Sequence, residues 1–222
     1  MANETLSAKQ ADKIIERANE IVSTCKQRME TKNNEFVNKI STIWEDKNAV
    51  EYMKEHKKSF EDIISQFGNN NKIFAETVKD IATAYIKAGA MSVAVSVMPI
   101  TLTANILIDK VKEFFANGQN TDDFGFKNPQ AGAEQVMDAF VTLKTELEKE
   151  VNNAVNKIKG INAFGNVQIQ NNLAQSAGDM VKILKERIAY EEKAIREAVD
   201  KTAQGYIKLG SSGETSAKIS SN

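Results

Sequence analysis

Apolar residues recur at intervals of three, four or seven positions over much of the chain, which is the spacing of one helix face. The first stripe covers residues 8–43 and consists of Ile14, Ala18, Ile21, Cys25, Met29, Phe36, Ile40 and Ile43. We predict a single amphipathic helix over this range, with Ser7 as its N-cap. A helix of that length would span roughly 54 Å at 1.5 Å per residue.

A second stripe follows the short interruption at residues 44–48. It consists of Val50, Met53, Phe60, Ile63, Ile64, Phe67, Phe74, Val78, Ile81 and Tyr85. Residues 68–71 read Gly-Asn-Asn-Asn, and these poor helix formers predict a kink or a short break. Two long antiparallel helices joined by a short turn are the simplest arrangement of the first two stripes.

The second half of the chain has the same plan. A third stripe runs from Val136 to Ile158 and ends at Gly160, and a fourth runs from Ile169 to Tyr206 after a break at residues 161–166. Residues 210–222 are mostly small or polar, which predicts a flexible tail.

These patterns predict an all-α protein of two tandem helical hairpins that form an elongated four-helix bundle. The first hairpin occupies residues 1–87, an apolar connector with a short helix and a loop occupies 88–128, and the second hairpin occupies 129–209. Phe36, Phe60, Phe67, Phe74 and Phe140 fall at helical core spacing, so we predict that they pack in the core.

The two halves also match in sequence. Shifting the chain by 121 positions places residues 71–89 on residues 192–210, and eight of these 19 pairs are identical, including Tyr85 with Tyr206 and Lys87 with Lys208. A shift of 120 places Trp44 opposite Phe164, each at a predicted hairpin tip. We interpret the match as an internal duplication, with each aromatic covering the last apolar layer of its hairpin.

Composition excludes several functions. The chain has 29 Lys plus Arg and 30 Asp plus Glu, so its formal net charge of −1 gives no electrostatic footprint for nucleic acid. It has one histidine and one cysteine, and it lacks the common catalytic and phosphate-binding motifs. We therefore expect no enzymatic activity, no cofactor and no metal site. Cys25 is predicted to be a small buried hydrophobe, and His56 to lie on a solvated, charged face.

The first half resembles the WXG family of small proteins of the bacterial type VII secretion system. The resemblance rests on Trp44-Glu45-Asp46 in the first turn, on Ala49 and Tyr52 after it, and on residues 81–85 near the end of the second helix. Phe164-Gly165-Asn166 takes the equivalent place in the second half. The family's turn glycine is replaced by Asp46, its tryptophan is replaced by Phe164 in the second copy, and its Tyr-x-x-x-Asp/Glu export signal is absent.

The resemblance implies a protein that acts by recognition and pairs as helical hairpins, within one chain or as a homo- or hetero-oligomer. It also implies a secretion ATPase or a partner effector protein as the binding partner. Candidate recognition residues at the helix ends are Tyr85, Lys87, Tyr206 and Lys208. The N-terminus has no apolar stretch of the Sec type. We therefore expect a cytoplasmic protein that is secreted by another route or reaches the bacterial surface.

Residues 88–108 carry no charge and are long enough to span a bilayer as a helix. Three interpretations stay open: a buried crossover between the hairpins, a short β-hairpin turning near Pro99, and a membrane-inserting element. An apolar, membrane-inserting segment between long helices resembles the layout of the helical pore-forming toxins. This resemblance gives an alternative function as a toxin component. The candidate membrane residues are Val93, Val95, Val97, Pro99, Ile100 and Leu102. A structural protein of a phage or appendage is a further hypothesis.

Overall fold

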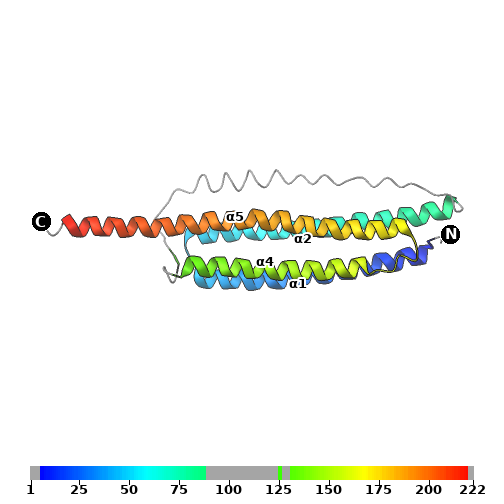
Figure 1. Cartoon of the computed structure of the whole chain (residues 1–222), viewed down its shortest axis with the longest axis horizontal. Helices are drawn as coiled ribbons and strands as arrows, with labels where there is room; N and C mark the ends of the chain where they lie inside the picture. The colour runs from blue at the N-terminus through cyan, green and yellow to red at the C-terminus, as the bar shows by residue number, and fades with distance from the viewer. Residues whose placement is uncertain (1–5, 89–124, 127–130, 220–222) are drawn as a thin grey trace. The chain divides into compact units, whose positions relative to one another are not determined.

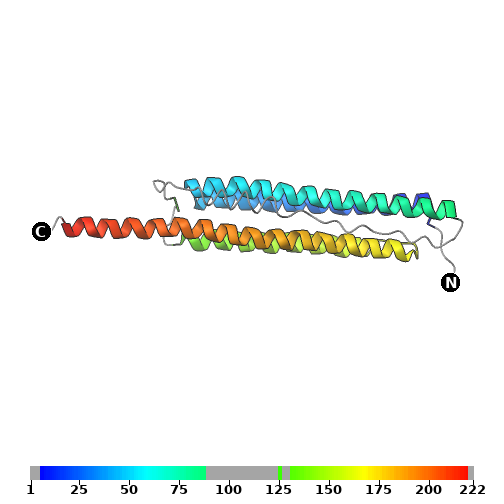
Figure 2. The same cartoon turned by 90° about the horizontal axis from the view of Figure 1, so that it is seen from above.

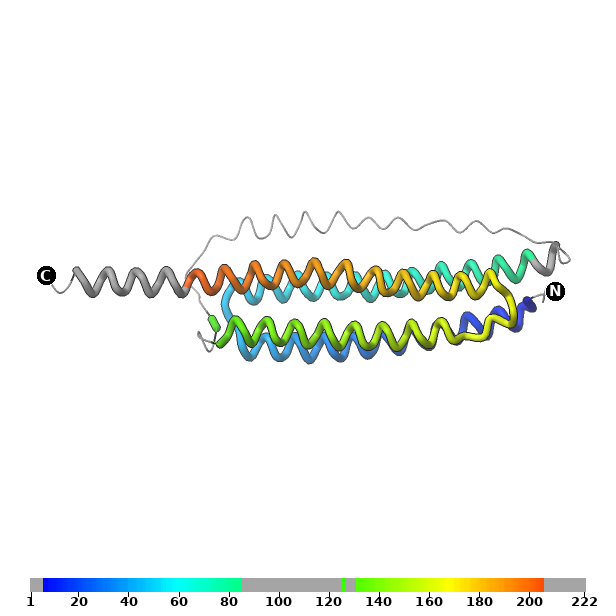
Figure 3. The backbone as a smooth tube through the Cα atoms, viewed as in Figure 1, coloured from blue at the N-terminus to red at the C-terminus, as the bar shows by residue number. Residues whose placement is uncertain are grey.

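The computed structural model of the chain describes residues 6–88, 125–126 and 131–219. Within these ranges the chain forms four helices and no strand: α1 (Ala8–Ile43), α2 (Lys47–Ala88), α4 (Gly132–Lys159) and α5 (Val167–Ile219) (Figure 1). This confirms the predicted all-α, four-helix bundle. Figure 3 follows the backbone through the tight turn between α1 and α2 and through the longer loop between α4 and α5.

Contacts divide the chain into two compact units, and each unit takes a segment from all four helices. Unit 1 comprises Met1–Asn33, Phe60–Met98 and Lys144–Ile188, and unit 2 comprises Asn34–Ser59, Pro99–Leu143 and Ala189–Asn222. Both units therefore contain parts of both predicted hairpins. The α1–α2 turn belongs to unit 2 and the α4–α5 loop belongs to unit 1.

In unit 1, α2 lies beside α5 and α1 lies beside α4 (Figures 1 and 2). The Asp62 carboxylate binds the Arg187 guanidinium, and the Asn70 side-chain amide donates to the Ser176 carbonyl over 2.9 Å. Since the α2 positions rise as the α5 positions fall, these two helices are antiparallel. The core of unit 1 is aliphatic and aromatic, and its fully buried members include Ile14, Met29, Phe67, Leu173 and Met180.

The core of unit 2 is unusually rich in rings. Phe36 from α1 packs edge-on against Phe140 from α4, with 6.3 Å between the ring centroids. Trp44, Tyr52 and His56 are also buried in this unit. Here too α2 lies beside α5 in the antiparallel direction, because Asn48 contacts Thr202 while His56 contacts Glu191. The predicted core positions Phe36, Phe60, Phe67, Phe74 and Phe140 are all buried.

The start of α1 matches the sequence prediction. Ser7 is the N-cap, because its Oγ accepts a hydrogen bond from the Gln10 backbone N–H over 3.2 Å. The Gln10 side-chain oxygen in turn accepts from the Ser7 backbone N–H over 2.8 Å. This reciprocal pair is a capping box, which satisfies two backbone donors at the helix start.

Of the kink or short break predicted at residues 68–71, the break is wrong, because α2 continues through this stretch. Tertiary contacts outweigh the low helix propensity of this stretch. The Asn70 amide bonds the Ser176 carbonyl and hydroxyl on α5, and the Asn71 amide donates to the Asn19 side chain on α1 over 2.6 Å. The asparagines that suggest a break are therefore contacts to neighbouring helices.

The sequence also placed the end of the last helix too early, at Gly210. The structure continues α5 to Ile219. Two glycines in this stretch cost about 1 kcal/mol each relative to alanine, while the Ala, Glu and Lys residues around them favour a helix. Gly210 therefore does not have to act as a helix terminator.

Candidate functional site at the Trp44 turn

The two hairpin turns start their second helices in the same way. At the first turn, the Asp46 carboxylate accepts a hydrogen bond from the Ala49 backbone N–H over 2.7 Å and so caps α2. At the second, the Asn166 side-chain oxygen accepts from the Ile169 N–H over 3.0 Å and caps α5. Asp46 and Asn166 are 120 positions apart, the shift that aligns Trp44 with Phe164. The capping role supports the predicted duplication.

Trp44 is buried, with 1% of its surface exposed. Its ring stacks on Tyr52 from α2 at a centroid distance of 6.1 Å and an interplanar angle of 28°. Its other described ring partner is Phe126, with 5.8 Å between the ring centroids and an interplanar angle of 30°. The tryptophan therefore covers the end of the core in unit 2, as its place at the hairpin tip predicted.

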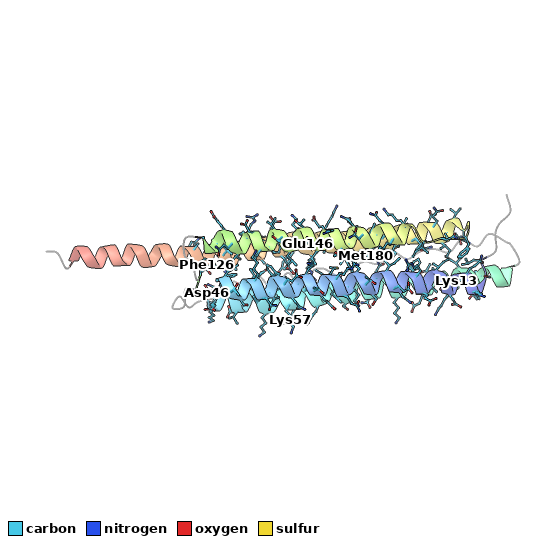
Figure 4. The ribbon with its side chains drawn as sticks, turned by 90° about the horizontal axis from the view of Figure 1, so that it is seen from below. Lys13, Asp46, Lys57, Phe126, Glu146 and Met180 are labelled. Atoms are coloured by element: carbon cyan, nitrogen blue, oxygen red, sulfur yellow. The ribbon has the colours of Figure 1, made fainter. Side chains whose placement is uncertain are left out.

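Phe126 comes from the short described piece between α2 and α4, and the sequence analysis did not single it out. Trp44 and Phe126 form an isolated antiparallel bridge, and the Glu45 N–H donates to the Gly125 carbonyl over 2.8 Å. Only 4% of the Phe126 surface is exposed. Figure 4 shows Phe126 and Asp46 at the same end of unit 2. Phe126 lies in a stretch rich in Asn, Asp and Gly that has no helical spacing of apolar residues, so its contact with Trp44 was not predictable from the helix pattern.

Asp46 also joins the first hairpin to the second. Its second carboxylate oxygen accepts a hydrogen bond from the Thr202 hydroxyl on α5 over 2.9 Å, and both residues are buried. The Asn48 amide donates to the same hydroxyl over 3.3 Å. A glycine at position 46 could make neither the cap nor this link.

The second turn differs in detail. Phe164 is only half-buried and has a positive φ of 51°, followed by Gly165 at 76°. The Phe164 N–H donates to the Asn162 side chain over 2.8 Å, which stabilises this left-handed conformation. Phe164 therefore shares the position of Trp44 in the repeat without its full burial.

His56 is buried, contrary to the predicted solvated face. Its ring stacks on Tyr52 with 5.8 Å between the ring centroids. It also packs edge-on against Phe36, with a centroid distance of 4.9 Å. Its Nδ1 lies 2.6 Å from a carboxylate oxygen of Glu191 on α5, with 1% and 8% of the two side chains exposed. The neighbouring Lys57 and Lys58 suggest an exposed face in the sequence, and Lys57 does lie on the outer face of α2 (Figure 4). A charged run on a helix contains one inward position per turn, and here that position is His56.

Several polar atoms around this pair have no hydrogen-bond partner among the described residues. They are the Tyr52 hydroxyl, the second Glu191 oxygen, the Ser59 hydroxyl and the Trp44 indole nitrogen. Burial, and then the charge of Glu191, raise the pKa of Tyr52 well above 10. The phenol therefore stays protonated over the physiological range.

Cys25 is buried in unit 1, as predicted. Burial, and then the Glu150 carboxylate, raise the pKa of its thiol to about 12. The thiol lies beside a groove of about 270 Å³ between α1 and α4, where Arg28 pairs with Glu150 over 3.3 Å. A thiol with so high a pKa is a poor nucleophile.

The remaining sequence-predicted residues fall outside what the structure describes in full. Tyr85, Lys87, Tyr206 and Lys208 lie on helical backbone, and their side chains are not described. The candidate membrane residues between Val93 and Leu102 lie outside the described residues. The described ranges contain no cluster of three or more potential metal ligands. None of the helices in those ranges has an apolar stretch sufficient to cross a membrane.

Comparisons of this chain with protein-family models, with curated proteins and with solved structures found no match.

Proposed function

We propose that the chain is a non-enzymatic type VII secretion substrate, or an export partner of such a substrate, and that it acts through recognition of its helical hairpins. The observation that supports this most is the shared design of the two turns. Asp46 and Asn166 cap equivalent helices, one turn carries a buried tryptophan, and α2 pairs with α5. This is the plan expected of a tandem WXG-like protein whose two hairpins pair within one chain.

The end of α5 is the recognition element in this proposal. Thr202 binds Asp46 at the level of the α1–α2 turn, and α5 continues from there to Ile219. Tyr206 and Lys208 lie on α5 four and six positions after Thr202. In this proposal the partner binds this end of α5 while the four-helix bundle stays folded.

Export from the source bacterium tests the proposal. We expect the protein in the culture supernatant of cells with an active type VII ATPase and its loss from the supernatant of cells without one. Tyr206→Ala with Lys208→Ala should reduce export. Lys182→Ala with Lys185→Ala is the matched control, because both lysines are exposed on the same helix. Equal release with and without the ATPase would overturn the proposal.

The uncharged segment 88–108 favours one competing function, a membrane-inserting toxin component. Dye release from liposomes distinguishes the two. Leakage from anionic or zwitterionic vesicles, together with ATPase-independent release, would favour the toxin function. Intact vesicles with both lipid types would count against it.

A further inference from the structure

Gly125 and Phe126 lie outside the four helices, yet both contact the Trp44 turn. The Glu45 N–H binds the Gly125 carbonyl, and the Phe126 ring stacks on Trp44 with its side chain almost fully covered. A backbone hydrogen bond beside an inserted side chain combines the two kinds of contact that give affinity and specificity when an extended peptide docks on a receptor. The Trp44 turn therefore holds this dipeptide as a receptor holds a ligand.

The site selects both residues of the dipeptide. A Cβ atom on Gly125 would lie 2.6 Å from the Asp46 backbone nitrogen and 3.0 Å from the Glu45 carbonyl carbon, so any side chain there collides with backbone. Phe126 rests on Gly132, where a Cβ atom would lie 2.5 Å from the Phe126 Cβ. The first position must be glycine, and the second is a large ring that fills the space between Trp44 and Gly132.

Each chain carries one such site and one such ligand. Gly-Phe occurs only at residues 125–126 of the sequence. The segment contacts Glu45 and Trp44, which lie 80 or more positions away in the chain, so a second copy could supply the same backbone hydrogen bond and the same ring in a domain swap.

We propose that the Trp44 turn, with Tyr52 and Gly132, is a recognition site for an extended glycine–phenylalanine segment, and that Gly125–Phe126 of a second copy of this chain can occupy it. This inference rests on the contacts of unit 2 and is independent of export.

Trp44 reports on the site directly because it is the only tryptophan in the sequence. The Phe126→Ala chain keeps the site and lacks the ligand, so its tryptophan emission should shift to longer wavelength as water reaches the ring. The Trp44→Ala chain keeps the ligand, lacks the stacking face and does not emit under selective tryptophan excitation. Mixing the two full-length chains tests whether the second supplies Phe126 to the first.

We expect titration with the Trp44→Ala chain to return the emission of the Phe126→Ala chain to the wild-type wavelength, with a heterodimer seen by light scattering. The Trp44→Ala/Phe126→Ala chain is the matched control donor, and it should cause no return. Trp44→Leu serves as the donor if circular dichroism shows that Trp44→Ala does not fold. The proposal is overturned if Phe126→Ala leaves the emission unchanged. It is also overturned if the donor does no more than its control at up to about 1 mM, the effective concentration of a short tether.

Discussion

At the scale of single residues, the contact between His56 and Glu191 has the largest expected effect on stability. Both side chains are buried, they come from different hairpins, and the second Glu191 oxygen has no partner among the described residues. Replacing His56 leaves the buried Glu191 carboxyl without the ring nitrogen that lies 2.6 Å from it, and removing one partner of a buried ionic pair costs about 3–5 kcal/mol.

We therefore predict that His56→Phe lowers the free energy of unfolding by about 3–5 kcal/mol, although a phenylalanine keeps the ring contacts with Tyr52 and Phe36. Urea unfolding followed by circular dichroism measures this. Adding Glu191→Leu should recover most of the loss, because the apolar pair leaves no buried carboxyl without a partner. Lys57→Ala on the exposed face should change stability by no more than about 0.5 kcal/mol. A loss below about 1 kcal/mol for His56→Phe would mean that Glu191 escapes to solvent.

Cys25 gives a pH-dependent prediction. Its pKa is about 12 in the folded chain against an ordinary value of 9.0, so the folded state holds the proton more tightly than the unfolded state. Stability from this group is complete below pH 9 and is lost as the pH rises towards 12, at up to about 1.4 kcal/mol per pH unit.

Denaturation of the wild type and of Cys25→Ala between pH 8 and pH 10.5 measures the effect of the thiol. The variant should be less stable at pH 8, because it leaves a small cavity, and should lose less stability as the pH rises. Equal slopes for both proteins would show that the thiol ionises without opening of unit 1. Tyr52, whose pKa is also raised, contributes to the slope of both proteins equally.

At the scale of elements, periodicity was sufficient to predict where the helices lie. Predicted α1 matches the structure at both ends, and α4 ends next to the predicted Gly160. Propensity misled only where side chains bond to other helices, as at Asn70, or where nothing forces a helix to stop, as at Gly210. The turn residues Trp44 and Asp46 were identified in advance, whereas Phe126 and His56 were missed because their burial depends on tertiary contacts.

The two helix caps allow a matched comparison. Asn166→Ala should cost about 1 kcal/mol, the usual value of an N-cap. Asp46→Ala should cost about 0.5–1.5 kcal/mol more, because the hydrogen bond from the Thr202 hydroxyl is also lost, while this hydroxyl keeps the Ala198 carbonyl as an acceptor at 3.2 Å. Urea unfolding of both variants, and of Thr202→Val with and without Asp46→Ala, separates the two contributions. Equal losses for Asp46→Ala and Asn166→Ala would show that the link to Thr202 contributes little.

At the scale of the whole molecule, polar contacts join the first hairpin to the second inside each unit. Unit 1 has Arg28 with Glu150 and Asn70 with Ser176, and unit 2 has His56 with Glu191 and Asp46 with Thr202. The apolar cores of both units also draw on all four helices. Neither hairpin can bury its apolar stripe without the other, so we expect their pairing to be independent of the covalent connector.

Cutting the connector tests this expectation. A protease site inserted after Gly118, in the connector and before Gly125–Phe126, should allow cleavage into two hairpins that still elute together at micromolar concentration. The uncut protein should unfold at the same denaturant midpoint at every concentration. The apparent stability of the cut protein should instead fall by about 1.4 kcal/mol for each tenfold dilution, because its folding has become bimolecular. Separate elution of the fragments would mean that the tether, rather than the facing surfaces, holds the hairpins together, and the interpretation of this chain as two fused pairing partners would then fail.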